Sequence, residues 1–246
     1  MAEATIVEVV AVVFFATIFR TTFGFGEALV AVPLLALVIP IQVAAPIAVL
    51  ASIVIAGYIV ARDWRHIHLQ SAGWLVASTL FGLPVGLLAL KTVPEAIMKL
   101  VLAAIILAFS GYSLVRARRL SLADDRFAWL FGFCAGVFGG SYGMNGPPLA
   151  IYGSLRGWAP EKFRATLQGY FLPASVLGMC GYGAAGLWTV PMGRLFAWSL
   201  PAIALGIVAG RLLNRRLAAE RFRRLLHGGL MLVAVVLVVQ TYFVME

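Results

Sequence analysis

The amino-acid sequence predicts an all-α integral membrane protein made of two inverted repeats, each with one broken helical pair and three further spanning helices. Three features lead to this prediction: long apolar runs, two glycine-rich interruptions, and basic residues gathered in short loops. Hydrophobic residues fill 62% of the 246 positions and charged residues only 12%, whereas a soluble domain carries about 25% charged residues. Apolar stretches of about 18 or more residues are typical of transmembrane helices.

Ten apolar segments follow one another along the chain. The stretches 43–61, 71–90 and 226–245 contain no Lys, Arg, Asp or Glu. No stretch is suited to a separate soluble domain, so we divide a single transmembrane domain into an N-terminal repeat, 1–119, and a C-terminal repeat, 120–246. The approximate limits of the segments are 5–20, 28–40, 43–61, 71–90, 95–115, 127–139, 147–157, 162–182, 194–213 and 225–245.

Two adjacent pairs of these segments are short and broken. The first pair is split at residues 21–27 and the second at residues 139–146, and both breaks are rich in glycine. Each pair is longer than the roughly 20 residues of one span, so it is either two short spans or a re-entrant hairpin that turns inside the membrane. In both cases the pair makes an even number of crossings.

The two halves of the chain have the same order of features. A shift of 119 positions places residues 23–26 on 142–145, and a shift of 124 places the glycines of 82–86 on those of 206–210. We expect these last glycines to serve close helix packing, because GxxxG spacing lets two helices approach. Three spans and an even pair give an odd number of crossings per half, which inverts the second half relative to the first, as in many transporters.

Basic residues predict the orientation. Because Lys and Arg concentrate in cytoplasmic loops, we place four basic stretches inside and both termini outside. The first ten residues carry two glutamates and no basic residue, which argues against a cleaved signal peptide. The basic stretches are 62–70, 116–126, 156–164 and 211–224, whereas 40–42 and 183–193 have no Lys or Arg.

The net charge of +9 also fits a membrane protein. In a soluble protein it would suggest a nucleic acid, but between spans it serves orientation and contact with anionic headgroups. We therefore expect the lipid bilayer and no nucleic acid as a partner, and the sequence leaves a homodimer open. Cys134 and Cys180 lie far apart in apolar segments, and the three histidines have no evident metal partners, so neither a metal nor a cofactor is expected.

Candidate substrate-binding residues gather at the two breaks. Irregular backbone is tolerated at membrane depth only beside protein or a water-filled cavity, and glycine permits close approach to a ligand. Helices that begin after such breaks direct free N–H groups toward the cavity, which suits an anion; the alternative is that the glycines only permit packing. The candidates are Arg20, Thr21, Thr22, Gly24, Gly26, Glu27, Gly140, Ser141, Tyr142, Gly143, Asn145, Gly146 and, in a later span, Gln168.

Four of these candidates have competing interpretations. Arg20 could bind an oxyanion through two parallel hydrogen bonds, or extend to an interface as lysine and arginine do in spans. Glu27 could take up a proton during transport, although an ion pair with Arg20 is favoured. Asn145 could donate to a substrate and also cap the helix that starts at the two following prolines. For Gln168 an interhelical hydrogen bond is the favoured role.

At the breaks the sequence resembles the sulfite exporter TauE/SafE family. The resembling stretches are TFGFGEALVAVP (22–33), GGSYGMNGPPLAIYG (139–153) and RATL (164–167), and the resemblance extends over essentially the whole chain. It implies a carrier of the bacterial inner membrane connected with the export of sulfite or organosulfonates. Family members often have a further glycine where this chain has Glu27, which bears on the identity of the substrate.

The favoured function is a secondary transporter for a small oxyanion, most plausibly an exporter of sulfite or an organosulfonate. A channel-like anion pore and a non-transporting assembly subunit are the alternatives. We do not expect an enzyme, because no histidine lies in a span beside Ser141 and the chain has no HExxH motif.

Overall fold

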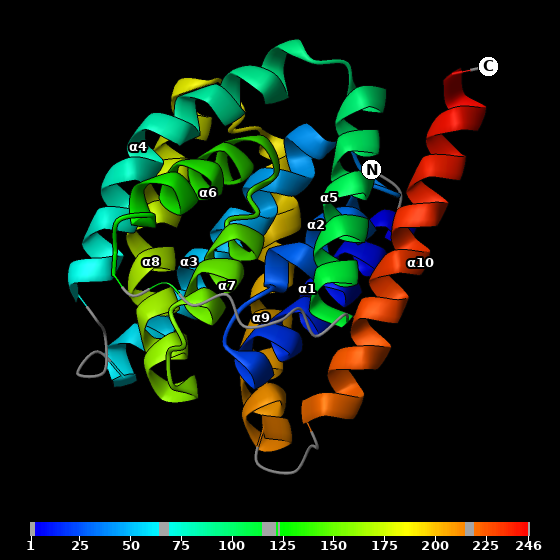
Figure 1. The fold of residues 1–246 in the computed structure, drawn as a ribbon. Coiled ribbons are helices and arrows are strands. Elements are labelled where there is room, and N and C mark those ends of the chain that lie inside the picture. The colour runs from blue at the N-terminus through cyan, green and yellow to red at the C-terminus, as the bar shows by residue number, and fades with distance from the viewer. Residues whose placement is uncertain (1–2, 64–68, 115–121, 123, 215–218, 246) are drawn as a thin grey trace.

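The computed structural model describes residues 3–63, 69–114, 122, 124–214 and 219–245. Within these ranges the regular structure is entirely α-helical, and Figure 1 shows the helices gathered into one bundle. The all-α prediction is therefore confirmed for the described chain. The helices are α1 (Glu3–Phe23), α2 (Glu27–Leu35), α3 (Ile41–Asp63), α4 (Leu69–Thr92), α5 (Glu95–Leu114), α6 (Ala128–Tyr142), α7 (Gly146–Leu155), α8 (Pro160–Ala184), α9 (Val190–Asn214) and α10 (Ala219–Met245).

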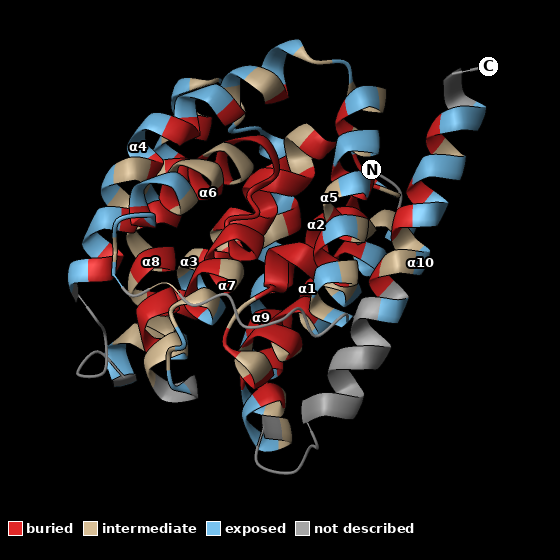
Figure 2. Cartoon of the chain, in the orientation of Figure 1, coloured by how far each residue is buried: buried red, intermediate tan, exposed pale blue. Residues whose placement is uncertain are grey.

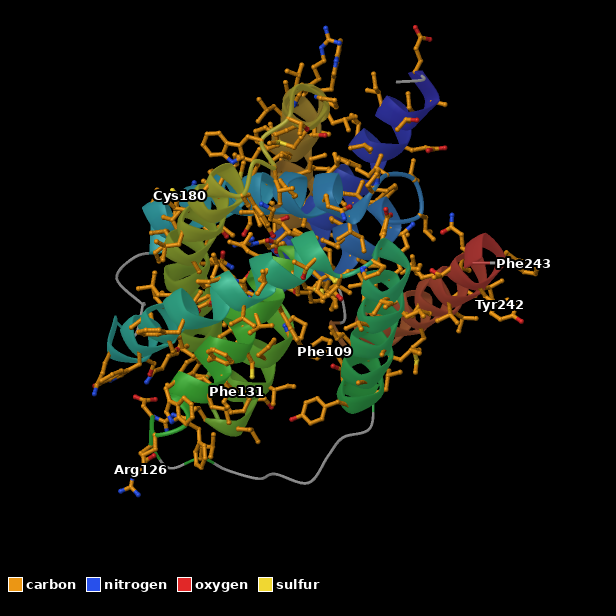
Figure 3. The ribbon with its side chains drawn as sticks, turned by 90° about the horizontal axis from the view of Figure 1, so that it is seen from above. Phe109, Arg126, Phe131, Cys180, Tyr242 and Phe243 are labelled. Carbon is orange, nitrogen blue, oxygen red and sulfur yellow. The ribbon has the colours of Figure 1, made fainter. Side chains whose placement is uncertain are left out.

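Helix length and composition identify a multi-pass membrane protein. Five helices, α1, α3, α4, α5 and α9, are long and apolar enough to cross a bilayer, and α10 contains a shorter apolar stretch, Leu230–Phe243. Many large apolar residues are exposed, and Figure 2 shows that the exposed positions lie mainly on the outward faces of the helices. Tyr242 and Phe243, for example, project from α10 away from the bundle (Figure 3) and are 62% and 71% exposed. Apolar surface on this scale requires a cover, which the hydrocarbon of the membrane supplies.

Each broken pair consists of a longer helix followed by a short one. The chain leaves helical geometry between α1 and α2, where Gly24 and Gly26 have φ of 88° and 94°, and between α6 and α7, where Gly143 has φ of 66°. Positive φ strongly favours glycine. With nine and ten residues, α2 and α7 are about 14 Å and 15 Å long, roughly half the thickness of a hydrocarbon core. Neither short helix can therefore cross a membrane alone.

The most extensive helix contacts join α4 to α6 and α1 to α9. At Gly82 and Gly86 of α4 an added Cβ would overlap backbone carbonyls of α6. At Gly206 of α9 it would lie 2.9 Å from Cβ of Thr17, and at Gly210 it would overlap Thr21. The prediction that both GxxxG motifs serve helix packing is thus confirmed.

The start of α1 and the end of α10 lie on the same side of the molecule, and the end of α9 and the start of α10 lie on the opposite side (Figure 1). Parts of three basic stretches, at 64–68, 115–121 and 215–218, lie outside the described residues. The orientation of the bundle in the membrane stays a prediction from the Lys and Arg pattern.

Candidate substrate site

Arg20, in the last turn of α1, is fully buried and bonded to three other helices. Its Nη1 donates to Ser52 Oγ of α3 at 2.7 Å and forms an ion pair with the Glu27 carboxylate of α2. Its Nη2 donates to Gln168 Oε1 of α8 at 2.6 Å. Arg20 has 0% exposure, so the interpretation that it extends to an interface is wrong. The favoured ion pair with Glu27 is confirmed.

The Arg20 guanidinium lies at mid-height of two long helices. Ser52 is the middle residue of α3, which has 23 residues. The Arg20 Cζ atom also lies 4.8 Å from the ring centroid of Phe171, which is next to the middle residue of the 25-residue α8. The first break therefore lies inside the bundle, near the centres of α3 and α8.

Gln168 joins this arginine to the irregular backbone of the first break. Its Oε1 accepts from Arg20, and its Nε2 donates to the carbonyl oxygen of Gly24. The expected interhelical hydrogen bond of Gln168 is therefore present, and both the oxygen and the nitrogen of its side-chain amide form hydrogen bonds. One donor of the cluster is left over, because Arg20 Nε is buried without a partner among the described residues. An unpaired buried N–H is rare in proteins and calls for a ligand or a water.

A small cavity beside this cluster is lined by both breaks. It has room for about one water molecule. The first three residues of α2 have N–H groups without a partner within the helix, whereas α7 offers only that of Gly146, because its next two residues are prolines. The positive ends of the two helix dipoles both border the cavity. The cavity is lined by Gly26, Glu27, Ala28 and Leu29 of the first break, Gly143, Asn145 and Gly146 of the second, and Ser52 and Phe171 of the neighbouring helices.

Asn145 is held by a chain of hydrogen bonds to α8 and α4. Its Nδ2 donates to the Tyr170 hydroxyl at 3.2 Å, and that hydroxyl lies 2.7 Å from Thr79 Oγ1. Asn145 occupies the N-cap position of α7, but its side chain makes no capping hydrogen bond. The capping interpretation is therefore wrong, because the two residues whose N–H groups a cap would bind, Pro147 and Pro148, have none.

The other predicted side chains do not line this cavity. Three hydroxyl groups donate to carbonyls one turn earlier in their own helix at 2.7–2.8 Å, and the Tyr142 hydroxyl donates to a carbonyl of α5 at 3.0 Å. Gly140 packs against the backbone of α4, and Thr21 and Thr22 also approach carbonyls of α9 at 3.3 Å and 3.2 Å. These last contacts and that of Tyr142 hold helices together around the site. The four hydroxyl bonds run from Thr21 to Thr17, from Thr22 to Ile18, from Ser141 to Val137 and from Tyr142 to Met98.

Three helical residues of the site were not predicted: Ser52, Tyr170 and Phe171. A fourth, Arg164 of α8, packs its aliphatic stem against the first break, since a Cβ on Gly24 would lie 2.5 Å from Arg164 Cγ. Within the described ranges no group of three or more His, Cys, Asp or Glu side chains could hold a metal ion. The chemistry of the site is thus that of hydrogen-bond donors and one buried cation.

Short helices that meet beside a buried charged residue in a multi-pass helical protein are a feature of many transport proteins. The chain belongs to the sulfite exporter TauE/SafE family, whose sequence model matches residues 9–237. It is accordingly a membrane protein of a transport family connected with sulfite export. No curated protein and no solved structure matches the chain significantly.

Proposed function

We propose that this protein is a secondary transporter that exports a small oxyanion, sulfite or an organosulfonate, across the bacterial inner membrane. The observation that carries the proposal is one cavity, lined by both helix breaks, beside the fully buried Arg20. We place the substrate in this cavity, between the N-terminal ends of α2 and α7.

The donors around the cavity favour an anion with several oxygen atoms. The free N–H groups at the start of α2 and that of Gly146 at the start of α7 can donate to different substrate oxygens. A guanidinium adds a planar pair of donors that matches an oxyanion, and Arg20 Nε is already unpaired. In this buried setting the partial positive charges of two helix ends and the full charge of Arg20 act together, with little screening by water.

The closed shape of the cavity supports a transporter that opens alternately to the two sides of the membrane. Room for about one water is too little for an oxyanion with three oxygen atoms. The two breaks must therefore separate for a substrate to enter, and the short helices α2 and α7 are the elements best placed to move. We assign this structure to an occluded conformation of the transport cycle.

The pattern of helix contacts supports the relation between the repeats 1–119 and 120–246. If each helix is replaced by its counterpart in the other half, the contact of α4 with α6 becomes the contact of α9 with α1. These are the two most extensive helix contacts. The same exchange holds for single residues: Gly140 meets Gly86, and Thr21 meets Gly210. Shifts of 119 and 124 positions relate these contacts. An inverted arrangement of the repeats, with both termini in the periplasm, completes the proposal.

Flux through purified protein in liposomes tests this function. We expect saturable uptake of labelled sulfite or a labelled sulfonate, with counterflow when the liposomes are preloaded with the same anion. Counterflow distinguishes a carrier from an anion pore. The matched control is Gly186→Ala, a glycine with positive φ and open space around it, far along the chain from both breaks. Folded protein that moves none of a panel of sulfite, sulfonates, sulfate and phosphate would refute the proposal.

A further inference from the structure

We infer that Glu27 exchanges with the substrate on Arg20 and carries one proton across the membrane with each anion. This inference rests on the proposed function and adds the coupling ion to it: proton and anion leave together, so export is driven by the concentration gradient of the anion. It starts from the position of the carboxylate. Glu27 lines the cavity, whereas Arg20 does not, and the two side chains form an ion pair with exposures of 6% and 0%. The carboxylate therefore separates the guanidinium from the space in which we place the substrate.

In the empty protein, the Glu27 carboxylate occupies a position suited to a substrate oxyanion. One of its oxygens accepts a hydrogen bond from Arg20 Nη1, and it belongs to the first residue of α2, where the helix end favours a negative charge. Both of these stabilising groups are the ones that the substrate needs. A substrate that enters must bind Arg20 in place of Glu27, so the ion pair between Arg20 and Glu27 must break.

No second cation in the described chain compensates a released Glu27 carboxylate. Arg20 is the only charged group that an ion pair joins to Glu27 among these residues. On α5, Lys99 is paired with Glu95 at 3.1 Å. On α8, Arg164 is an exposed residue, and its aliphatic stem lies beside Gly24. The neighbouring polar groups of α3 and α7, a serine and an asparagine, carry no charge.

Two anions in one buried site with one cation repel each other, and one of them binds a proton. A sulfonate is the anion of a strong acid, and sulfite enters this scheme as the monoanion bisulfite, so in both cases the coupled proton goes to an oxygen of Glu27. It comes from the water on the side where the anion enters, and it leaves to water on the other side when Glu27 returns to Arg20. Only an O–H bond forms and breaks.

The charge of the site explains why one proton per anion is the stable ratio. The empty site contains Arg20 as a cation and Glu27 as an anion, and its sum is zero. The loaded site contains Arg20, a monoanion and protonated Glu27, and its sum is again zero. The moving elements therefore carry no net charge through the hydrocarbon in either direction, which avoids the cost of burying an uncompensated charge.

Reconstituted full-length protein with labelled methanesulfonate, a monoanion at every usable pH, tests the exchange. For the wild type we expect an inward proton gradient of one pH unit to accumulate the anion by up to about tenfold. A potential imposed with potassium and valinomycin should leave its flux unchanged. Bisulfite in acidic buffer serves as a second monoanionic probe.

Two variants locate the coupling. Glu27→Gln has nearly the same shape but cannot carry a proton, so we expect flux that follows the imposed potential and no accumulation by the pH gradient. Glu27→Asp retains a carboxylate, and we expect accumulation by the pH gradient to persist. Wild-type flux that follows the potential and ignores the pH gradient would overturn the inference while leaving the proposed function intact. A Gln variant that still accumulates the anion with protons would overturn it as well. Absence of saturable flux for every oxyanion would instead refute the proposed function.

Discussion

Arg20 and Glu27 lie seven residues apart, on opposite sides of the first helix break, and form an ion pair inside the protein. The pair joins the end of α1 to the start of α2 across the glycine-rich turn. Breaking a buried pair by removing one partner leaves an uncompensated charge, whereas changing both partners removes the charge altogether. This relationship makes the site and the stability of the break depend on the same two side chains.

The first prediction concerns Arg20. Arg20→Gln should weaken oxyanion binding by about 1.5–3 kcal/mol, the contribution of a hydrogen bond to a charged group. Arg20→Lys should recover part of this loss, because lysine retains the charge but lacks the planar fork. Titration calorimetry of purified wild type and both variants with sulfite measures the difference. Unchanged affinity in folded Arg20→Gln would mean that the charge of the site comes from the helix ends alone.

The second prediction separates binding from stability at the same pair. Arg20→Gln alone should lower the free energy of unfolding by about 3–5 kcal/mol, because Glu27 stays buried and charged. The double variant with Glu27→Gln should regain most of that stability without regaining affinity. Thermal unfolding in detergent provides the comparison. A double variant no more stable than Arg20→Gln would show that the pair contributes little to folding.

The third prediction concerns the second break. Gly143 has positive φ, and a Cβ there would lie 2.7 Å from the carbonyl oxygen of Ala45, a backbone atom that cannot move aside. Gly143→Ala should therefore abolish substrate binding. Gly186→Ala is the matched control, because its φ of 76° imposes similar strain, of order 1–3 kcal/mol, in open space. If the two variants bind the substrate with equal affinity, the substrate does not bind at the second break.

The fourth prediction concerns the contact between α4 and α6. A Cβ at Gly82 would overlap the Phe133 carbonyl oxygen, whereas Gly73 of the same helix has nothing within 4 Å. Gly82→Ala should destabilise the fold, while Gly73→Ala should stabilise it by about 0.5–1 kcal/mol through helix propensity. Melting temperatures in detergent test both. Gly82→Ala with wild-type stability would contradict the close packing of these helices.

The fifth prediction concerns orientation. In a variant without Cys134 and Cys180, a cysteine at Leu187 should react with a membrane-impermeant reagent outside intact cells, and one at Arg126 should react only after permeabilisation. The reason is the Lys and Arg asymmetry of the loops. The reverse pattern would place the termini in the cytoplasm.

Much of the fold follows from the sequence because apolar runs and glycine breaks are local signals. All ten expected segments are helices, and most of their boundaries differ by a few residues. The pairing of Arg20 with Glu27 could also be predicted, since a buried charge in a span needs a nearby partner. The GxxxG positions were predictable for the same reason, because their spacing has a direct packing consequence.

The rest of the site depends on tertiary structure that no local pattern reveals. Ser52 and Phe171 lie within α3 and α8, and their position beside Arg20 depends on how these helices pack. The two prolines after Gly146 already leave Asn145 no N–H to cap, but the bond of its amide to Tyr170 depends on the packing of α8. Ser52 nevertheless left a signal, as a polar residue in the middle of an otherwise apolar segment.

Locating a bound anion tests the central claim most directly. Crystals of the protein grown with selenite, an analogue of sulfite, would give anomalous scattering from selenium. We predict one peak between the first turns of α2 and α7, with its oxygen atoms within hydrogen-bond distance of Arg20 and with Glu27 displaced from the guanidinium. A selenium site elsewhere in the bundle, with the ion pair between Arg20 and Glu27 intact in protein that transports the anion, would contradict the account.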